Sequence, residues 1–222
     1  MSNQPSTRGP HQGQPVKTAG KPLQEAQAAM ILVHGRGATA ASILELAEYL
    51  PHPEMAYLAP QASGNTWYPY SFLNPIHQNE PDLSSALQVL ADLVAQVEAA
   101  GIPSEHIILA GFSQGACLTS EFVARNARRY GGLLAFSGGL IGPPGTPRDY
   151  PGSLDGTPIF LGCSDVDFHI PKERVQETAD VFTRLGAAAT LRLYPGMDHT
   201  IIQEEIVEAQ KIVAGVGRRG NS

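Results

Sequence analysis

Residues 107–116 read Ile107-Ile108-Leu109-Ala110-Gly111-Phe112-Ser113-Gln114-Gly115-Ala116, and this stretch decides the fold of the 222-residue chain. It begins as a short apolar run, which predicts a buried strand, and it leads into a segment with helical spacing of apolar residues. Between the two lies the pattern G-x-S-x-G, a sharp strand-to-helix turn that leaves no room for side chains two residues before or after the serine. Gly111 and Gly115 provide that room, so we expect the hydroxyl of Ser113 to stand exposed at a helix N-terminus.

The rest of the chain repeats this alternation of strand and helix patterns. Short apolar runs predict strands at residues 29–33, 55–58, 107–110, 132–136, 158–161 and 190–194. Helical spacing predicts helices at residues 39–50, 83–100, 115–130, 172–185 and 201–216. Such alternation is typical of an α/β fold, in which helices cover both faces of a mostly parallel, twisted sheet. Reactive groups then gather at the carboxyl ends of the strands.

The length favours one domain, since domains usually hold roughly 100–200 residues. Residues 1–20 are rich in Pro, Gly, Gln and Ser, which predicts a mostly disordered tail that ends in an edge strand near residues 14–18. Residues 21–217 are predicted to form a single domain. Its strands and their connections use nearly all of these residues, so we expect no lid domain after Ser113 and a shallow, open site.

Composition excludes several classes of function. The chain has 15 Lys and Arg against 21 Asp and Glu, a net charge of −6, whereas nucleic-acid binding usually needs a basic surface. No apolar run approaches the roughly 18 residues of a membrane span, and no secretory signal is visible, so we expect a cytoplasmic protein without stable membrane insertion. Cys117 and Cys163 lack metal-ligand spacing, and neither a metal nor another cofactor is expected. A homodimer is the alternative to a monomer.

The serine needs a base and an acid. His169 and His199 are the histidines that follow Ser113 far enough along the chain. His199 is preferred because it lies in a turn between the last predicted strand and the last predicted helix, whereas His169 lies on a loop that more naturally supplies the acid. That acid is Asp165 or Asp167, and spacing alone does not separate the two.

The proposed chemistry is nucleophilic catalysis. His199 would take the proton of Ser113, and the carboxylate would hold the imidazole in the correct tautomer. The developing oxyanion needs two backbone N–H donors: one belongs to Gln114, and the other should come from the glycine turn His34-Gly35-Arg36-Gly37. A non-catalytic binding module on the same fold is disfavoured, because it would lack part of this set.

Four segments carry a family resemblance, at residues 34–37, 67–68, 101–116 and 165–171. They resemble the phospholipase/carboxylesterase family, which includes bacterial carboxylesterases and acyl-protein thioesterases, and the likeness extends from about residue 29 to about residue 210. The resemblance implies an α/β-hydrolase fold. It also implies that Asp167 is the acid and that the backbone N–H groups of Arg36 and Gln114 form the oxyanion site.

The resemblance further implies a serine carboxylesterase that needs no metal. Its substrates would be small-molecule esters with short to medium acyl chains, or thioesters or lysophospholipids, cleaved through an acyl-enzyme. One alternative is an acyl-protein thioesterase. Another is a hydrolase of small cyclic esters similar to dienelactone hydrolase, although those enzymes carry Cys where this chain has Ser113.

Two further hypotheses concern substrate binding. Residues 67–75 form an unusually aromatic stretch, and we expect four of its side chains to wall the acyl pocket: Trp67, Tyr68, Phe72 and Leu73. Arg36 would place a cation in an otherwise apolar entrance. We therefore expect it to favour a polar or anionic acyl or alcohol group.

Overall fold

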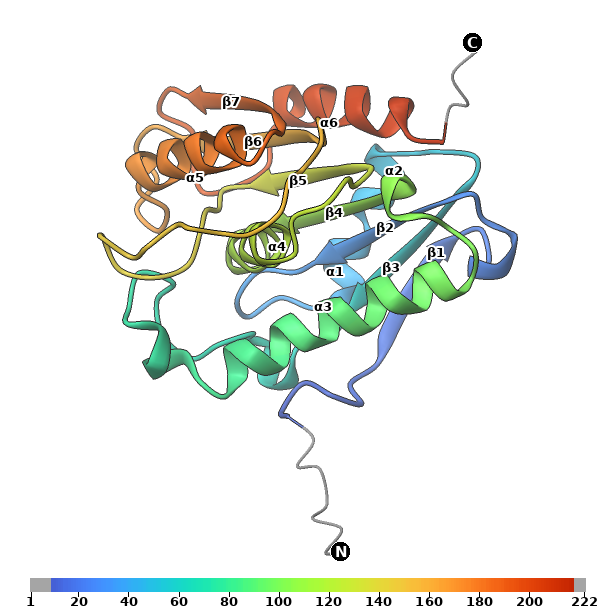
Figure 1. Cartoon of the computed structure of the whole chain (residues 1–222), viewed down its shortest axis with the longest axis horizontal. Helices are drawn as coiled ribbons and strands as arrows, with labels where there is room; N and C mark the ends of the chain where they lie inside the picture. The colour runs from blue at the N-terminus through green and yellow to red at the C-terminus, as the bar shows by residue number, and fades with distance from the viewer. Residues whose placement is uncertain (1–8, 218–222) are drawn as a thin grey trace, which may run out of the picture.

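The computed structural model describes residues 9–217, and its centre is a seven-stranded sheet (Figure 1). Along the chain the strands are β1 (Val16–Gly20), β2 (Ala28–Val33), β3 (Met55–Pro60), β4 (Ile107–Phe112), β5 (Gly132–Phe136), β6 (Pro158–Ser164) and β7 (Ala188–Tyr194). Their order in the sheet is β1-β3-β2-β4-β5-β6-β7. β1 runs antiparallel to β3, and the other neighbouring strands are parallel. This confirms the predicted mostly parallel sheet.

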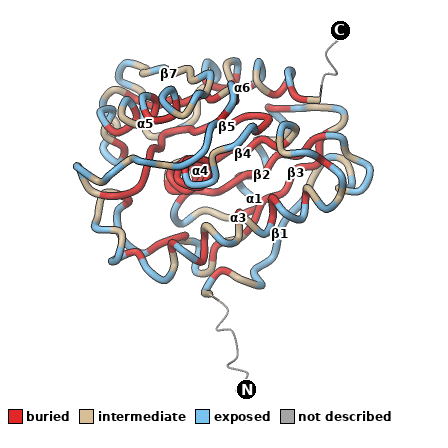
Figure 2. The backbone as a smooth tube through the Cα atoms, in the orientation of Figure 1, coloured by how far each residue is buried: buried red, intermediate tan, exposed pale blue. Residues whose placement is uncertain are grey.

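Helices cover both faces of the sheet (Figure 1). α3 (Asp82–Ala99), α4 (Gln114–Arg125) and α5 (Lys172–Arg184) pack on one face and share one hydrophobic core. α1 (Ala40–Leu44) and α6 (Gln203–Gly215) pack on the opposite face against a second core. Figure 2 shows the central strands and α4 almost entirely buried, and burial on both faces explains why a strand such as β2 reads as a continuous apolar run.

The register of the central strands places two glycine turns side by side. β2 pairs with β4 so that Val33 lies opposite Gly111. The next residues of the two strands enter the turn at residues 34–37 and the turn around Ser113, respectively. The carboxyl edge of the sheet therefore brings together the two segments from which the sequence predicts the oxyanion donors.

The N-terminal prediction needs a correction. The edge strand expected near residues 14–18 is present as β1, which starts and ends two residues later and pairs with β3. Disorder before this strand is wrong for residues 9–15, where His11 is buried, with 1% exposure. The His11 ring bonds the carbonyl oxygen of Trp67 at 2.9 Å and the N–H of Ser63 at 3.1 Å. These long-range contacts have no signature in local composition. Residues 1–8 of the predicted tail lie outside the described residues.

The helix predicted over residues 39–50 is interrupted. It consists of two short helices, α1 and α2 (Leu46–Tyr49), which meet at Glu45. The helix predicted over residues 115–130 ends at Arg125, because the chain turns back there to place Tyr130 N–H against the hydroxyl of Thr157 at 2.9 Å.

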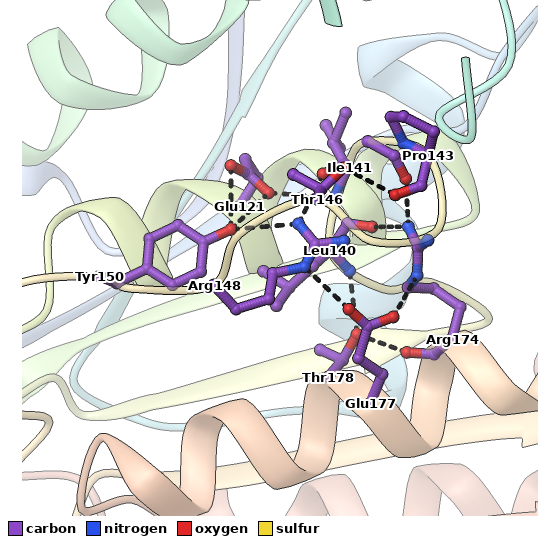
Figure 3. A network of polar contacts seen from close by, with 11 residues as sticks. Glu121, Leu140, Ile141, Pro143, Thr146, Arg148, Tyr150, Arg174, Glu177 and Thr178 are labelled. Atoms are coloured by element: carbon purple, nitrogen blue, oxygen red, sulfur yellow. Dashed lines mark hydrogen bonds and ion pairs between the residues drawn. The ribbon is translucent and has the colours of Figure 1, made fainter. Parts of the chain in front are cut away.

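The connection from β5 to β6 packs onto α4 and α5 through a polar network (Figure 3). Glu177 on α5 accepts from Arg148 at 2.9 Å and from Arg174 at 2.8 Å. Arg174 in turn donates to the carbonyl oxygens of Leu140 and Gly142, at 2.7 and 2.6 Å. The connection is thereby fixed against the body of the molecule and forms no separate lid.

Candidate active site

Ser113 sits in the turn that the glycine pattern predicts. Its φ of 55° and ψ of −119° are a strained backbone conformation for a residue with a side chain. A Cβ on Gly111 would collide with the backbone of Gly115, and a Cβ on Gly115 would collide with the carbonyl oxygen of Val33. Ser113 N–H donates to Phe136 O at 2.9 Å, so the turn is joined to the end of β5.

Three loops at the carboxyl edge of the sheet bring Ser113, His199 and Asp167 together. His199 Nε2 lies 2.8 Å from Ser113 Oγ, and His199 Nδ1 lies 2.6 Å from Asp167 Oδ2. The other carboxylate oxygen of Asp167 accepts the N–H groups of His169 and Ile170, at 2.8 and 3.0 Å. The Asp167 side chain has no exposed surface, whereas the His199 side chain is 22% exposed.

The pKa of Asp167 results from two opposing effects. Burial alone would raise it, because the charged form loses hydration. Hydrogen bonds from His199 and from the two backbone N–H groups stabilise that charged form and outweigh burial. The pKa therefore lies below its ordinary value, and the carboxylate stays ionised at neutral pH.

The structure also places the two residues that competed for these positions. Asp165 does not contact His199; its Oδ1 accepts the N–H of Gly196 at 2.8 Å, so it joins the loop after β6 to the loop that carries His199. His169 is exposed, and its ring centroid lies 4.9 Å from that of His199. It therefore flanks the base from the solvent side.

The glycine turn at residues 34–37 lies directly against the serine. A Cβ on Gly35 would stand 3.4 Å from Ser113 Cβ. His34 is buried, which lowers its pKa, and its Nε2 accepts the N–H of Ala62 at 3.1 Å. The indole of Trp67 donates to His34 O at 2.9 Å. The turn is thus fixed by a neutral histidine and a buried tryptophan.

The two predicted oxyanion donors are unoccupied by the chain itself. Within residues 9–217, neither Arg36 N–H nor Gln114 N–H donates to a protein acceptor. Arg36 follows Gly35 in the turn, and Gln114 follows Ser113 at the first position of α4, where N–H groups have no partner within the helix. Both N–H groups are therefore available to a ligand.

The Arg36 side chain has a different task from the one expected of it. Its Nη1 donates to Thr66 Oγ1 and Pro69 O at 3.0 and 2.9 Å, and its Nη2 donates to Tyr68 O and Tyr70 O at 2.9 and 2.7 Å. These bonds use the N–H groups with which a guanidinium grips a carboxylate. Arg36 holds the loop at residues 66–70 in place.

The Gln114 side chain also holds the loop at residues 66–70. It is 5% exposed, its Oε1 accepts Trp67 N–H at 2.9 Å, and its Nε2 donates to Tyr68 O at 2.8 Å. Sequence reasoning used only the backbone of this residue, because no local pattern indicates a partner 47 residues away.

A cavity of about 620 Å³ opens above Ser113. Its lining is Gly35, Arg36, Ala38, Tyr68, Pro69, Tyr70, Ser71, Phe72, Phe112, Ser113, Gln114, Cys117, His169, Ile170 and His199. Of the four side chains expected to wall it, Tyr68 and Phe72 do so. The expectation for Trp67 and Leu73 is wrong: the Trp67 indole turns into the core to reach His34 O, and Leu73 packs against the core shared by α3, α4 and α5.

Cys117 belongs to the buried core and also lines the cavity. It lies four residues after Ser113 on α4, so the helical period places both on the same side, and this spacing could have revealed it. Burial raises the pKa of Cys117 to about 12, so its thiol is a neutral part of the cavity wall.

Residues 9–217 contain neither a cluster of candidate metal ligands nor a helix that could span a membrane. His, Cys, Asp and Glu side chains nowhere gather in threes in an arrangement that could hold a metal ion. None of the helices in this part of the chain combines the length and apolarity needed to cross a membrane.

The chain is similar to known proteins over most of its length. A family model described as Phospholipase/Carboxylesterase matches residues 17–216. Acyl-protein thioesterase 1 of Debaryomyces hansenii is 29% identical over 150 residues, which cover 66% of this chain and 65% of that protein. Acyl-protein thioesterase 1 of Eremothecium gossypii is 28% identical over 216 residues, which cover 88% of this chain and 90% of that protein.

A solved structure is closer in sequence. The crystal structure of a phospholipase/carboxylesterase from Dyadobacter fermentans superposes with a TM-score of 0.88 at 47% identity, and the match covers 90% of this chain and 96% of that chain. The sheet order, the serine turn and these matches agree with one another. The chain therefore belongs to the phospholipase/carboxylesterase family of α/β-hydrolases, and it is a hydrolase of the carboxylesterase/thioesterase type.

Proposed function

We propose that this hydrolase is a serine carboxylesterase that cleaves small-molecule esters with short to medium acyl chains. The observation that carries the proposal is a continuous chain of two hydrogen bonds. His199 Nε2 lies 2.8 Å from Ser113 Oγ, and His199 Nδ1 lies 2.6 Å from Asp167 Oδ2. Nucleophile, base and orienting carboxylate in this geometry are typical of acyl transfer to serine.

In the acylation step Ser113 Oγ attacks the carbonyl carbon of the ester while its proton passes to His199 Nε2. The carbonyl oxygen gains the displaced electron pair and binds the N–H groups of Arg36 and Gln114. When the tetrahedral intermediate collapses, the bond to the leaving oxygen breaks and His199 gives that oxygen the proton. An alcohol departs and an ester on Ser113 remains.

In the deacylation step water repeats these moves. His199 takes a proton from water, the resulting hydroxide equivalent attacks the acyl carbon, and the Ser113 oxygen leaves with the proton that His199 returns. Asp167 remains ionised throughout and stabilises the imidazolium that forms twice in the cycle.

The cavity supports the substrate class. Its volume of about 620 Å³ lies within the range of small-molecule pockets, and its walls include the rings of Tyr68 and Phe72 and the neutral thiol of Cys117. These groups suit an acyl chain. Thioester hydrolysis is the second candidate, because the relatives from Debaryomyces hansenii and Eremothecium gossypii are named acyl-protein thioesterases.

The proposal includes action in the cytoplasm. The thiols of Cys117 and Cys163 are both free and buried, which suits a reducing compartment. The homodimer stays a prediction, which sedimentation of the purified protein would test.

Labelling with a fluorophosphonate tests the nucleophile. We expect one label per chain on the wild type, no label on Ser113→Ala, and full labelling of Ser84→Ala, a matched change at an exposed serine of α3. Persistent labelling or ester hydrolysis in Ser113→Ala would overturn the proposal.

A series of p-nitrophenyl esters and matched thioesters of increasing chain length tests the substrate class. We expect Phe72→Ala to move the optimum toward longer chains, because Phe72 lines the cavity, and Leu73→Ala, its neighbour outside the lining, to leave the optimum in place. An unchanged profile in both variants would show that this wall does not meet the acyl chain.

A further inference from the structure

A second cavity adjoins the first and is not used in the mechanism above. It has a volume of about 310 Å³ and lies between the α1–α2 segment and the residues that follow His199. Four residues line both cavities: Gly35, Ala38, Phe112 and His199. The two cavities therefore meet at His199, the residue that would transfer protons in the reaction.

The position of Ser113 distinguishes the two cavities, since Ser113 lines only the first, whereas His199 lines both. In acylation the leaving oxygen must lie within hydrogen-bond reach of His199 Nε2, because that atom supplies its proton. The second cavity is bounded by His199, Thr200 and Ile201, whereas the first extends past Ser113 to Cys117 and Phe72 on the other side. The acyl chain therefore occupies the first cavity, and the alcohol side of the ester enters the second.

The walls of the second cavity combine apolar side chains with one carboxylate, that of Glu45. Its apolar lining is Ala38, Ile43, Leu46, Phe112 and Ile201. Tyr49, 55% exposed, and Glu45 stand in the lining four residues apart, so they point to the same side of the α1–α2 segment. In the part of the chain that the structure describes, Glu45 forms no ion pair.

We propose that the second cavity is a leaving-group subsite that prefers alcohols with a compact quaternary ammonium group, such as choline. Such a group is a cation with an apolar surface of methyl groups. This inference depends on the proposed esterase function. An aromatic ring and a carboxylate at the edge of an apolar hollow attract an ammonium ion through cation–π and Coulomb interactions.

Two esters of the same acid isolate the charge of the leaving group. Butyrylcholine and 3,3-dimethylbutyl butyrate have leaving groups of nearly equal shape, but only choline is charged. Both produce the same acyl-enzyme, so deacylation is identical, and any difference in kcat/KM arises in acylation.

The matched variants are Glu45→Gln and Glu48→Gln, which remove one carboxylate each from the same segment, although only Glu45 lines the cavity. We expect the ratio of kcat/KM for the choline ester over the neutral ester to fall about two- to fivefold in Glu45→Gln at low salt, as for an exposed ion pair. Glu48→Gln should keep the wild-type ratio. The wild-type ratio should also fall as salt is raised, because salt screens exposed charges.

Tyr49→Leu tests the aromatic part of the subsite. We expect a further fall of about two- to fivefold in the same ratio, with Tyr49→Phe unchanged because the ring is kept. A wild-type ratio retained by Glu45→Gln and Tyr49→Leu, while both esters are hydrolysed, would overturn the subsite but leave the esterase standing. Failure to hydrolyse either ester while Ser113 still takes the fluorophosphonate would also overturn it. Loss of labelling at Ser113 would instead refute the esterase function.

Discussion

Glu205 is a buried carboxyl group whose ionisation should weaken the fold as the pH rises. It is fully buried; its Oε2 accepts the N–H of Ile202 at 3.0 Å, and its Oε1 has no partner among residues 9–217 and faces Gly162. Burial raises the pKa of Glu205 to about 7, because one backbone hydrogen bond does not replace the hydration of a carboxylate. The nearby charge of Glu204 acts in the same direction.

The sign of the effect follows from proton binding. Between the ordinary pKa of 4.5 and the raised pKa of about 7, the folded chain keeps a proton that the unfolded chain has lost. The free energy of unfolding therefore falls with rising pH across this window, and the stabilisation is complete below it. The two pKa values differ by about 2.5, which at about 1.4 kcal/mol for each tenfold change in proton affinity gives a loss of about 3.5 kcal/mol.

Urea unfolding of the wild type and Glu205→Gln at about pH 5 and about pH 8 measures this loss. The variant keeps an oxygen acceptor for Ile202 N–H but cannot ionise. The free energy of unfolding of Glu205→Gln minus that of the wild type should be about 2–3 kcal/mol larger at pH 8 than at pH 5. The buried histidines His11 and His34 titrate in both proteins and cancel. Glu204→Gln removes an exposed neighbouring charge that only contributes to the raised pKa, so it should show a much smaller change in the same direction, and an equal gap at both pH values for Glu205→Gln would refute the reasoning.

Three further predictions concern the site. Asp167→Asn should lower kcat/KM for a p-nitrophenyl ester by roughly 10³- to 10⁴-fold, since the amide disturbs the imidazole tautomer, whereas Asp165→Asn keeps an acceptor for its backbone donor and should lose less than about tenfold. A smaller loss of kcat/KM in Asp167→Asn than in Asp165→Asn would contradict the choice of Asp167 as the acid. Gln114→Leu should reduce the free energy of unfolding by about 1–3 kcal/mol in urea, because Trp67 N–H is left buried without an acceptor, and an unchanged midpoint would contradict this. Arg36→Leu should lower the thermal midpoint by several degrees but leave the kcat/KM ratio of neutral to carboxylate-bearing esters unchanged; an altered ratio would restore the hypothesis that its charge selects the substrate.

The sheet and the serine turn could be predicted because their signals are local. Strands β2 and β4 are buried on both faces, so each reads as an unbroken apolar run that leads into a glycine turn. The strain at Ser113 requires Gly111 and Gly115 at fixed spacing, which the sequence displays directly. The position of His199 followed from chain order, since parallel strands end at one edge of the sheet.

The roles of the Arg36 and Trp67 side chains could not be predicted, because their partners are distant in sequence. Arg36 bonds to carbonyl oxygens more than 30 residues away, and nothing near it in the chain distinguishes a guanidinium that holds a loop from one that meets substrate. Trp67 looked like a pocket wall because it begins an aromatic stretch. Its burial depends on the contact of its indole with His34 O, which only the fold reveals.

The two aspartates of the loop after β6 show how the fold resolves an ambiguity that spacing leaves open. Asp167 has one oxygen bound by two consecutive backbone N–H groups, which turns the other oxygen toward His199. Asp165 reaches across to Gly196, in the loop that carries His199. Asp167 therefore holds the His199 ring, and Asp165 joins the loop after β6 to the loop that carries His199. Because backbone donors rather than water fix this geometry, the charged groups need little reorganisation when a substrate binds. Under the proposed function, selection among substrates falls to the two open cavities that share His199.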